Sequence, residues 1–152
     1  MNSKTDIRIQ ENDETMHVGQ PEACDRKIIL VVDDQQAIRT SFQRLLTCEI
    51  PQSEIHVAEN GAVAVEHFRK HRDGTILMDL HMPVMDGLTA FHEIEKICQT
   101  DNCEMPSVLF CTGYEPPREF DGIIKDSSRH GLLLKPVSCE ILVAEIRKRL
   151  VA

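Results

Sequence analysis

From Lys27 to the end of the chain, short apolar runs alternate with longer amphipathic stretches. Such alternation is typical of repeated strand-helix units that build a parallel sheet with helices on both faces. The predicted strands cover residues 28–32, 55–58, 75–78, 107–111 and 132–134. The first of them, Ile28-Ile29-Leu30-Val31-Val32, is apolar throughout, as a central strand buried on both faces must be. The sequence therefore predicts an α/β fold of five strand-helix units.

Apolar residues at helical spacing follow each predicted strand. The side chains expected to face the core are Ile38, Phe42, Leu45 and Leu46, then Ala64, Val65 and Phe68, then Leu88, Phe91, Ile94 and Cys98, then Phe120, Ile123 and Ile124, and last Leu142, Ile146 and Leu150. Pro116-Pro117 blocks an early helix start after the fourth strand, so we expect a short fourth helix. Ser138 is well placed to cap the last helix.

The chain has 152 residues, which is enough for one compact domain. Residues 1–25 carry acids and amides with few large apolar side chains, so burial cannot offset the entropy of ordering them. We expect a flexible N-terminal tail over residues 1–25 and one domain over residues 26–152.

The formal net charge is −8, from 25 acidic and 17 basic residues, which argues against direct binding to nucleic acid or to an anionic membrane surface. The N-terminus has no apolar signal segment, and no apolar run is long enough to cross a bilayer. Six cysteines without C-x-x-C spacing are typical of reduced thiols in a cytosol. We expect a cytoplasmic protein that binds a metal ion or a cationic partner.

The residues with chemical potential follow the predicted strands directly: Asp33 and Asp34 after the first, Asp79 after the third, Thr112 after the fourth and Lys135 after the fifth. In doubly wound sheets, ligands bind at the edge where the carboxyl ends of the strands meet. Clustered carboxylates repel one another unless a cation neutralises them, and hard oxygen ligands suit Mg²⁺. A carboxylate beside Mg²⁺ can form an aspartyl phosphate, and a hydroxyl and an ammonium group can receive the phosphoryl oxygens.

Four stretches together resemble the receiver domain of two-component response regulators. They are Val31-Val32-Asp33-Asp34, the run from Leu77-Met78-Asp79 through Leu80-His81-Met82-Pro83-Val84-Met85 to Asp86-Gly87, then Thr112-Gly113, and Lys135-Pro136. The resemblance covers roughly residues 26–152. It implies a flavodoxin-like, doubly wound (βα)5 fold whose parallel sheet has the strand order 2-1-3-4-5.

The same resemblance implies the role of each site residue. Asp79 is the phosphoacceptor, and Asp34, Asp79 and the main-chain carbonyl of His81 hold Mg²⁺ while Asp33 assists through water. Thr112 and Lys135 match the switch hydroxyl and the phosphate-contacting lysine. The Lys135-Pro136 peptide is cis in this family, and the bond before proline is where cis costs least.

The sequence departs from the family near the fifth strand. Leu132 occupies the position where the family usually has Phe or Tyr, so the usual coupling to the threonine is open to question, and Val137 replaces a frequent Phe. His81 and Tyr114 match variable positions that tune hydrolysis of the acyl phosphate. We hypothesise that Tyr114 partly covers the site and lengthens the phosphorylated state.

Two other pairs of residues have a more ordinary interpretation. His67 and His71 have a spacing that can bind a transition metal, but no third ligand is evident in the sequence, so a solvated helix face is expected. Cys98 and Cys103 are close in sequence, and burial is expected rather than a redox pair.

The sequence therefore predicts a phosphoacceptor switch and not an enzyme with its own substrate. Its predicted partners are a sensor histidine kinase or phosphotransfer protein, and a downstream protein at the face of the fourth helix, fifth strand and fifth helix of the domain; a homodimer is left open. One alternative is a Mg²⁺-dependent phosphohydrolase, which would want Asp-x-Asp after the first strand where this chain has Asp34-Gln35-Gln36. Another is an interaction module that never takes phosphate. The chain is either a stand-alone regulator or a piece of a longer protein.

Overall fold

The computed structural model describes residues 20–125 and 129–150. Its centre is one parallel sheet made of β1 (Asp25–Val32), β2 (Glu54–Ala58), β3 (Asp73–Met78), β4 (Ser107–Thr112) and β5 (Gly131–Leu134). The strands lie in the order β2-β1-β3-β4-β5, with all four pairings parallel. The predicted doubly wound fold and its strand order are confirmed.

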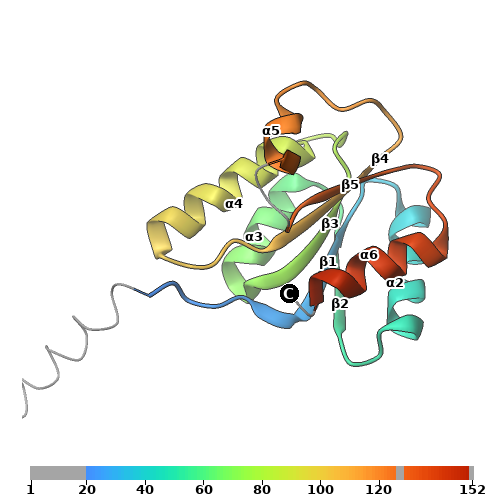
Figure 1. The fold of residues 1–152 in the computed structure, drawn as a ribbon, viewed down its shortest axis with the longest axis horizontal. Coiled ribbons are helices and arrows are strands. Elements are labelled where there is room, and N and C mark those ends of the chain that lie inside the picture. The colour runs from blue at the N-terminus through green and yellow to red at the C-terminus, as the bar shows by residue number, and fades with distance from the viewer. Residues whose placement is uncertain (1–19, 126–128, 151–152) are drawn as a thin grey trace, which may run out of the picture.

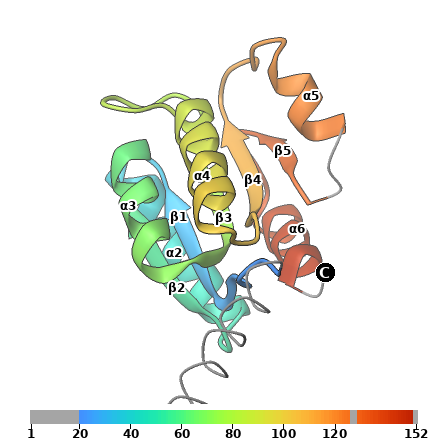
Figure 2. The same cartoon turned by 90° about the vertical axis from the view of Figure 1, so that its left-hand side faces the viewer.

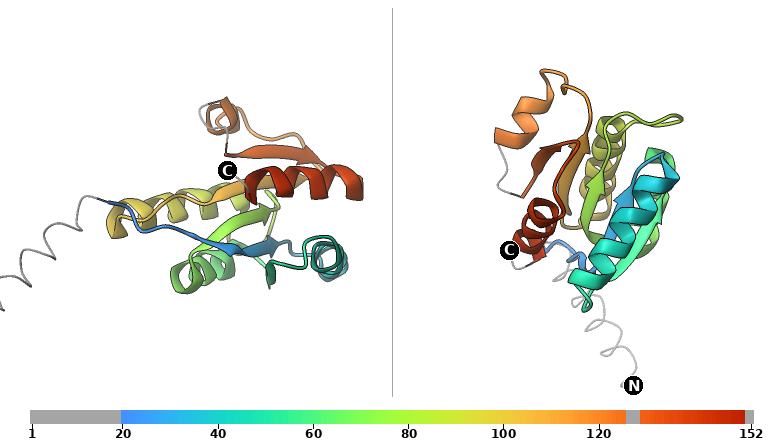
Figure 3. Two further views of the ribbon diagram at one scale, coloured as in Figure 1. Left: turned by 60° about the horizontal axis from the view of Figure 1, so that its bottom comes forward. Right: turned by 90° about the vertical axis from the view of Figure 1, so that its right-hand side faces the viewer.

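Helices cover both faces of the sheet (Figure 1). They are α2 (Gln36–Glu49), α3 (Gly61–His71), α4 (Gly87–Asp101), α5 (Phe120–Lys125) and α6 (Cys139–Leu150). Figure 2 looks onto the side where α3 and α4 pack together, and the right-hand view of Figure 3 looks onto α2 and α6. The fourth predicted helix, α5, is short, as expected. No helix among the described residues is long and apolar enough to span a bilayer.

The central strand β1 shows why its sequence is apolar throughout. Ile29 and Val31 belong to the core cluster that includes residues of α2 and α6, whereas Leu30 and Val32 belong to the cluster that includes residues of α3 and α4. All four side chains are buried. Because successive residues of a strand point to opposite faces, a strand covered on both sides has no position for a polar side chain.

Short polar side chains fix where three of the helices begin. Asn60 accepts a hydrogen bond from the Val63 amide at the start of α3, and Asp86 accepts one from the Thr89 amide at the start of α4. Ser138 accepts one from the Ile141 amide, as predicted for α6. These caps satisfy amides that have no partner inside the helix and so set where each helix leaves its preceding loop.

Part of the predicted tail is bonded to the domain. The Glu22 amide donates to the Asn102 carbonyl at 2.8 Å, and the Glu104 amide donates to the Glu22 carbonyl at 2.7 Å. Asp25 is already the first residue of β1. Ordered pairing therefore starts before residue 26, while residues 1–19 of the predicted tail lie outside the described residues.

Candidate functional site

Three carboxylates meet at the carboxyl ends of β1 and β3. Asp33 and Asp34 follow β1 and Asp79 follows β3, and their ligand oxygens all lie within 4.8 Å of one another. The main chain places Asp33 and Asp79, because the Asp33 amide donates to the Ala58 carbonyl and the Asp79 amide to the Val32 carbonyl. Each residue is thus held by one further rung of the sheet beyond the end of its strand. The sequence prediction that these acids converge is confirmed.

The side chain of Lys135 reaches the carboxylates from the other side of β4, along the carboxyl ends of the strands. It follows β5, two strands away from β3, and its Nζ lies 2.7 Å from Asp33 Oδ2 and 3.4 Å from Asp79 Oδ2. The Lys135 side chain is 19% exposed and that of Asp33 only 3%. The ammonium group therefore bridges two buried carboxylates and is held more tightly by Asp33 than by Asp79.

The charges in this cluster shift one another's protonation. Burial raises the pKa of the Asp79 carboxyl; the positive charge of Lys135 works against this rise and the negative charge of Asp33 adds to it. Burial lowers the pKa of the Lys135 ammonium group, but its hydrogen bond to Asp33 and the charges of both carboxylates outweigh that effect and raise it overall. The lysine is thus kept charged, and Asp79 is a carboxylate whose ionised form is poorly solvated.

Thr112 ends β4 beside β3 and is fully buried. Its carbonyl accepts the Lys135 amide at 2.8 Å, and its Oγ1 accepts the Tyr114 amide at 3.3 Å. The Lys135-Pro136 peptide is cis, as the resemblance implied. The threonine and the lysine are therefore tied together through the main chain at the sheet edge.

Two exposed rings flank the loops after β3 and β4. The His81 amide donates to Asp79 Oδ1 at 3.3 Å, and the His81 ring meets the Tyr114 ring edge to face with centroids 5.0 Å apart. Tyr114 is 68% exposed. The two variable positions singled out in the sequence thus contact each other beside the loop that carries Asp79.

Three contributions to this geometry were missed in the sequence. A Cβ at Gly87 would lie 2.1 Å from the Asp79 carbonyl oxygen, so only glycine lets α4 start this close to the strand end. Arg39 donates to the Asp33 carbonyl at 2.8 Å, and the Gln35 amide donates to Asp33 Oδ1 at 2.9 Å. The sequence shows Asp86-Gly87 as a turn, but it does not show how closely Gly87 approaches the Asp79 carbonyl. It also gives no sign of which group Arg39 will bind.

Comparison with known proteins identifies the family. The family model described as "Response regulator receiver domain" matches residues 29–147, which is most of the chain. The chain belongs to the response regulator receiver domain family. The predicted resemblance to this family is confirmed.

Relatives of this receiver domain are found in several bacteria. The transcriptional regulatory protein YdfI of Bacillus subtilis is 34% identical over 114 residues, which is 75% of this chain and 50% of that protein. A protein-glutamate methylesterase/protein-glutamine glutaminase of Aliivibrio fischeri is 38% identical over 82 residues, which is 54% of this chain and 20% of that protein. The chain thus matches half or less of these two proteins, and the methylesterase match covers only a receiver-sized part.

A solved structure supports the same assignment. The chemotaxis protein CheY4 of Vibrio cholerae has a TM-score of 0.64 with 26% sequence identity, covering 80% of this chain and 96% of that one. The likeness therefore extends over almost the whole of a single-domain receiver. Receiver domains are signalling domains, and they generally bind Mg²⁺ at an acidic pocket.

The carboxylate cluster of this receiver domain fits such an ion. Asp33, Asp34 and Asp79 offer only hard oxygen atoms, and the Asp34 side chain lies on an exposed residue at the mouth of the cluster. The apposed charges of Asp33 and Asp79 are balanced by a single ammonium group. An additional cation with oxygen ligands and retained waters would relieve the remaining repulsion.

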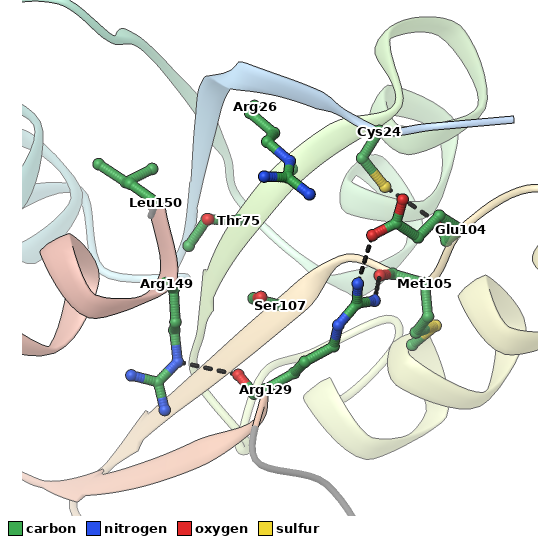
Figure 4. Close-up of a pocket in the computed structure, with 10 residues that line it drawn as sticks. Cys24, Arg26, Thr75, Glu104, Met105, Ser107, Arg129, Arg149 and Leu150 are labelled. Atoms are coloured by element: carbon green, nitrogen blue, oxygen red, sulfur yellow. Dashed lines mark hydrogen bonds and ion pairs between the residues drawn. The ribbon is translucent and has the colours of Figure 1, made fainter. Parts of the chain in front are cut away.

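A second polar pocket of the receiver domain lies at the opposite edge of the sheet (Figure 4). Two of its arginines, Arg129 and Arg149, are engaged in bonds within the domain. Arg129 pairs with Glu104 and donates to the Met105 carbonyl, and Arg149 donates to the Arg129 carbonyl at 3.0 Å. These contacts join the starts of β4 and β5 to the end of α6. The pocket therefore has an architectural explanation.

Proposed function

We propose that this receiver domain takes a phosphoryl group onto Asp79 from a sensor histidine kinase or a phosphotransfer protein. The observation that supports this most directly is the Lys135 ammonium group between Asp33 and Asp79, at 2.7 and 3.4 Å. It places a fixed positive charge next to the carboxylate that would act as nucleophile. Electrostatic groups held in position in this way are the main means of stabilising phosphoryl transfer.

In the proposed reaction, an Asp79 carboxylate oxygen attacks the phosphorus of a phosphohistidine. The new P–O bond forms as the P–N bond breaks, and the histidine nitrogen of the donor keeps the electron pair. Lys135 exchanges part of its contact with Asp33 for a phosphoryl oxygen, and the Thr112 hydroxyl donates to another. The partly buried position of Asp79, with 8% of the residue exposed, limits the water that competes as acceptor.

Asp34, Asp79 and the His81 carbonyl would hold the Mg²⁺ ion, with Asp33 assisting through water. When bound, the ion neutralises charge on the phosphoryl oxygens. Asp33 accepts the Gln35 amide at Oδ1 and Lys135 at Oδ2, so both of its oxygens are already engaged. This supports an indirect role for Asp33 and a direct one for the exposed Asp34.

The phosphorylated state is proposed to persist because Tyr114 shields it. The Tyr114 ring contacts the His81 ring edge to face beside the site, and the Tyr114 amide donates to Thr112 Oγ1. A movement of Thr112 toward a phosphoryl group would pull on the chain that carries Tyr114. Apart from accepting phosphate from donors, including small ones, and losing it by hydrolysis, the domain needs no further catalytic activity.

The output surface is proposed to be the face of α5, β5 and α6. Leu134 on β5 and Ile141 on α6 are large apolar side chains with 59% and 53% exposed. Leu132 packs against the core cluster at the position of the usual aromatic, so a smaller side chain would transmit the Thr112 movement. The receiver unit is proposed to span residues 26–152 in the cytoplasm, binding a downstream protein rather than nucleic acid or a membrane.

The decisive experiment is incubation with acetyl phosphate and Mg²⁺, followed by intact-mass measurement. We expect a mass increase of one phosphoryl group that needs Mg²⁺ and is lost in Asp79→Asn. The matched control is Asp86→Asn, the same substitution in an exposed residue whose capping bond to the Thr89 amide asparagine can also make. This control should be phosphorylated like the parent protein.

Other outcomes would favour the alternative functions. Steady release of inorganic phosphate without a stable mass shift would favour a phosphohydrolase, and no reaction with any donor would favour a non-phosphorylated module. Hydrogen exchange with and without beryllofluoride tests the output face: we expect altered exchange in Phe120–Lys125 and Gly131–Leu134 but not in Gln36–Glu49. Altered exchange confined to α2 would contradict the proposed face.

A further inference from the structure

A cluster of three histidines lies on the other half of the molecule from Lys135. His56 projects from the edge strand β2, and His67 and His71 stand one turn apart on α3. The ring centroids are 4.8 Å apart for His56 and His67, 4.3 Å for His67 and His71, and 5.4 Å for His56 and His71. One ring nitrogen from each lies within 4.8 Å of the others. The third ligand that was not evident in the sequence is therefore supplied by β2.

Two of these rings belong to a chain of polar contacts that ends in a buried carboxylate. His56 Nδ1 lies 2.8 Å from His67 Nε2, and His67 Nδ1 lies 3.0 Å from Asp73 Oδ2. At the other end, His56 Nε2 lies 3.4 Å from Glu54 Oε2. Asp73 is fully buried, and its Oδ1, also 3.0 Å from His67 Nδ1, has no hydrogen-bond partner. The expectation of a solvated helix face is wrong for His67.

The outer ring nitrogens, His67 Nδ1 and His56 Nε2, face the carboxylates of Asp73 and Glu54, and we assign the N–H to each of them. The inner nitrogens, His56 Nδ1 and His67 Nε2, face each other and need one proton between them. A metal ion can replace that proton and accept both inner nitrogens as ligands, while the hydrogen bond of His67 to Asp73 and the ion-pair contact of His56 with Glu54 remain. A histidine ligand that donates its other N–H to a carboxylate is the usual arrangement around protein-bound transition metals.

We propose that His56, His67 and His71 bind a divalent transition-metal ion of the Zn²⁺ class, with Glu54 and Asp73 orienting the first two ligands. Three neutral imidazoles suit such ions and not Mg²⁺, so the site is chemically distinct from the carboxylate cluster. It is also separate from it, since His56 is paired with Leu30 in the sheet, three residues or about 10 Å along the strand before Asp33. The fourth position is left to water.

The His56–His67 pair needs only a small adjustment to accept the ion, and His71, whose ligand nitrogen lies within 4.8 Å of theirs, is exposed and can turn toward it. Two nitrogens at 2.0–2.1 Å from a tetrahedral metal are about 3.3 Å apart, so the 2.8 Å contact must open by roughly half an ångström. The element that must move is β2, which pairs with a neighbour on one side only. The His56 side chain is 28% exposed and that of His67 is 17% exposed, so the ion can enter from solvent.

A purely structural role explains only part of the cluster. Satisfying Asp73 requires His67, and His56 can complete the hydrogen bonding of His67, but His71 contributes to neither contact. His71 is exposed and its ring stacks at 31° to that of His67. Its removal should leave the fold intact and yet weaken metal binding, which separates the two explanations.

The test uses the untagged, metal-stripped 152-residue protein in excess Mg²⁺, so that the carboxylate cluster is filled. Titration with Co²⁺ followed by visible absorption, and then competition by Zn²⁺, should show one equivalent bound without a thiolate charge-transfer band. His56→Ala and His71→Ala should each weaken binding at least about tenfold. His92→Ala is the matched control, because His92 is an exposed helix histidine whose ring contacts Phe91 and Glu95 and lies outside the three-histidine cluster; this variant should bind as the parent does.

Three results would overturn the proposal. One is the absence of saturable Co²⁺ or Zn²⁺ binding to the folded parent protein. Another is binding that both His56→Ala and His71→Ala retain within about twofold of the parent, with circular dichroism showing all variants folded. A thiolate band at full occupancy would likewise assign the ion to cysteines and not to this cluster.

Discussion

Two aspartates at opposite ends of β3, Asp73 and Asp79, have different surroundings. Asp73 begins β3 at the edge where the strands start, which we call the amino edge, and Asp79 follows β3 at the carboxyl edge. Burial raises the pKa of both carboxyls, and a cationic or hydrogen-bonding partner opposes the rise in each case: His67 for Asp73 and Lys135 for Asp79. Asp73 is sealed at 0% exposed, while Asp79 keeps 8% and has two further acids beside it.

The difference teaches which buried carboxylate is available for chemistry. A nucleophile needs an open approach and neighbouring groups that receive the transferred charge, and only the carboxyl edge supplies Lys135, Thr112 and a carboxylate cluster that can hold a cation. Asp73 instead orients one side chain, that of His67. Perturbed protonation alone therefore does not distinguish a reactive aspartate from an architectural one.

The largest effect that would test this contrast is on the amino edge. His67→Ala removes the partner of a fully buried carboxylate, and we expect the free energy of unfolding to fall by about 3 kcal/mol. Urea denaturation measures it, in the presence and absence of Mg²⁺, which should make no difference to the loss. His71→Ala, one turn further along α3 and exposed, is the control and should cost less than about 0.5 kcal/mol. A His67→Ala protein as stable as the parent would break the comparison.

Removing the corresponding partner on the carboxyl edge should damage chemistry more than stability. Lys135→Met deletes the ammonium group shared by Asp33 and Asp79, and we expect phosphorylation by acetyl phosphate to slow about 100-fold. Stopped-flow or quenched-flow mass analysis gives the rate. Lys125→Met, which replaces a lysine at the end of α5, should leave the rate unchanged. A rate loss below about threefold would remove Lys135 from the proposed mechanism.

The tight contact at the end of β3 can be tested separately from its charge. Gly87→Ala would drive a Cβ into the Asp79 carbonyl, so we expect a loss of about 2 kcal/mol in unfolding free energy and slower phosphorylation. Gly122→Ala is the matched control, since a Cβ there meets nothing within 4 Å and lies in α5. That variant should be equal or more stable, because alanine favours a helix over glycine.

The amino edge also holds a neutral histidine that makes stability depend on pH. Burial lowers the pKa of His130 to about 4, and the charges of Arg129 and Arg149 add to this. Its Nδ1 accepts the Val108 amide at 3.1 Å. The unfolded chain binds a proton near pH 6.5, so this contribution to stability is complete above that pH and is lost as the pH falls toward 4.

The variant His130→Asn cannot titrate but can still accept a hydrogen bond. Between pH 7 and pH 4, we expect its free energy of unfolding to fall by about 1 to 2 kcal/mol less than that of the parent, with solvent screening allowed for. Chemical denaturation at a series of pH values measures the difference. Parallel stability curves for the two proteins would show that His130 is not held neutral. The five other described histidines are common to both proteins, so their titration cancels.

The smallest predicted effect concerns the exposed ring at the carboxyl edge. Tyr114→Ala should speed loss of phosphate from Asp79 by about threefold, which corresponds to about 0.6 kcal/mol. Tyr114→Phe keeps the ring against His81 and should retain the parent rate. An unchanged or slower rate in Tyr114→Ala would show that the ring does not restrict water.

The strands and the carboxyl-edge residues could be read from the sequence because each signal is local. A run such as Ile28 to Val32 is continuous and ends in acids, and every parallel strand brings its end to the same edge. Distances across that edge could not be read. Nothing in the sequence indicates that Lys135 lies closer to Asp33 than to Asp79.

The histidine cluster shows the opposite limit. His67 and His71 are recognisable as a pair because helical spacing is periodic, but His56 joins them only through the packing of α3 against β2. The burial of Asp73 was equally hidden, since an acid at a strand start is most often solvated. Residues brought together by tertiary packing have no fixed offset along the chain, and this is why the sequence predicted one site and overlooked the other.

The hydrogen bonds that fix the carboxyl edge come from the main chain. The amides of Asp33, Asp79 and Lys135 donate to carbonyls of neighbouring strands, whatever side chains those positions carry. In the proposed function, substitutions at His81 and Tyr114 in the loops, or at Leu132 in β5, would therefore alter timing and partner choice while the reacting atoms stay in register. In the proposed function, the main chain of the scaffold fixes the position of the reacting atoms, and the loop side chains set the lifetime of the phosphorylated state. Single substitutions can therefore change the lifetime during evolution without changing the position of the reacting atoms.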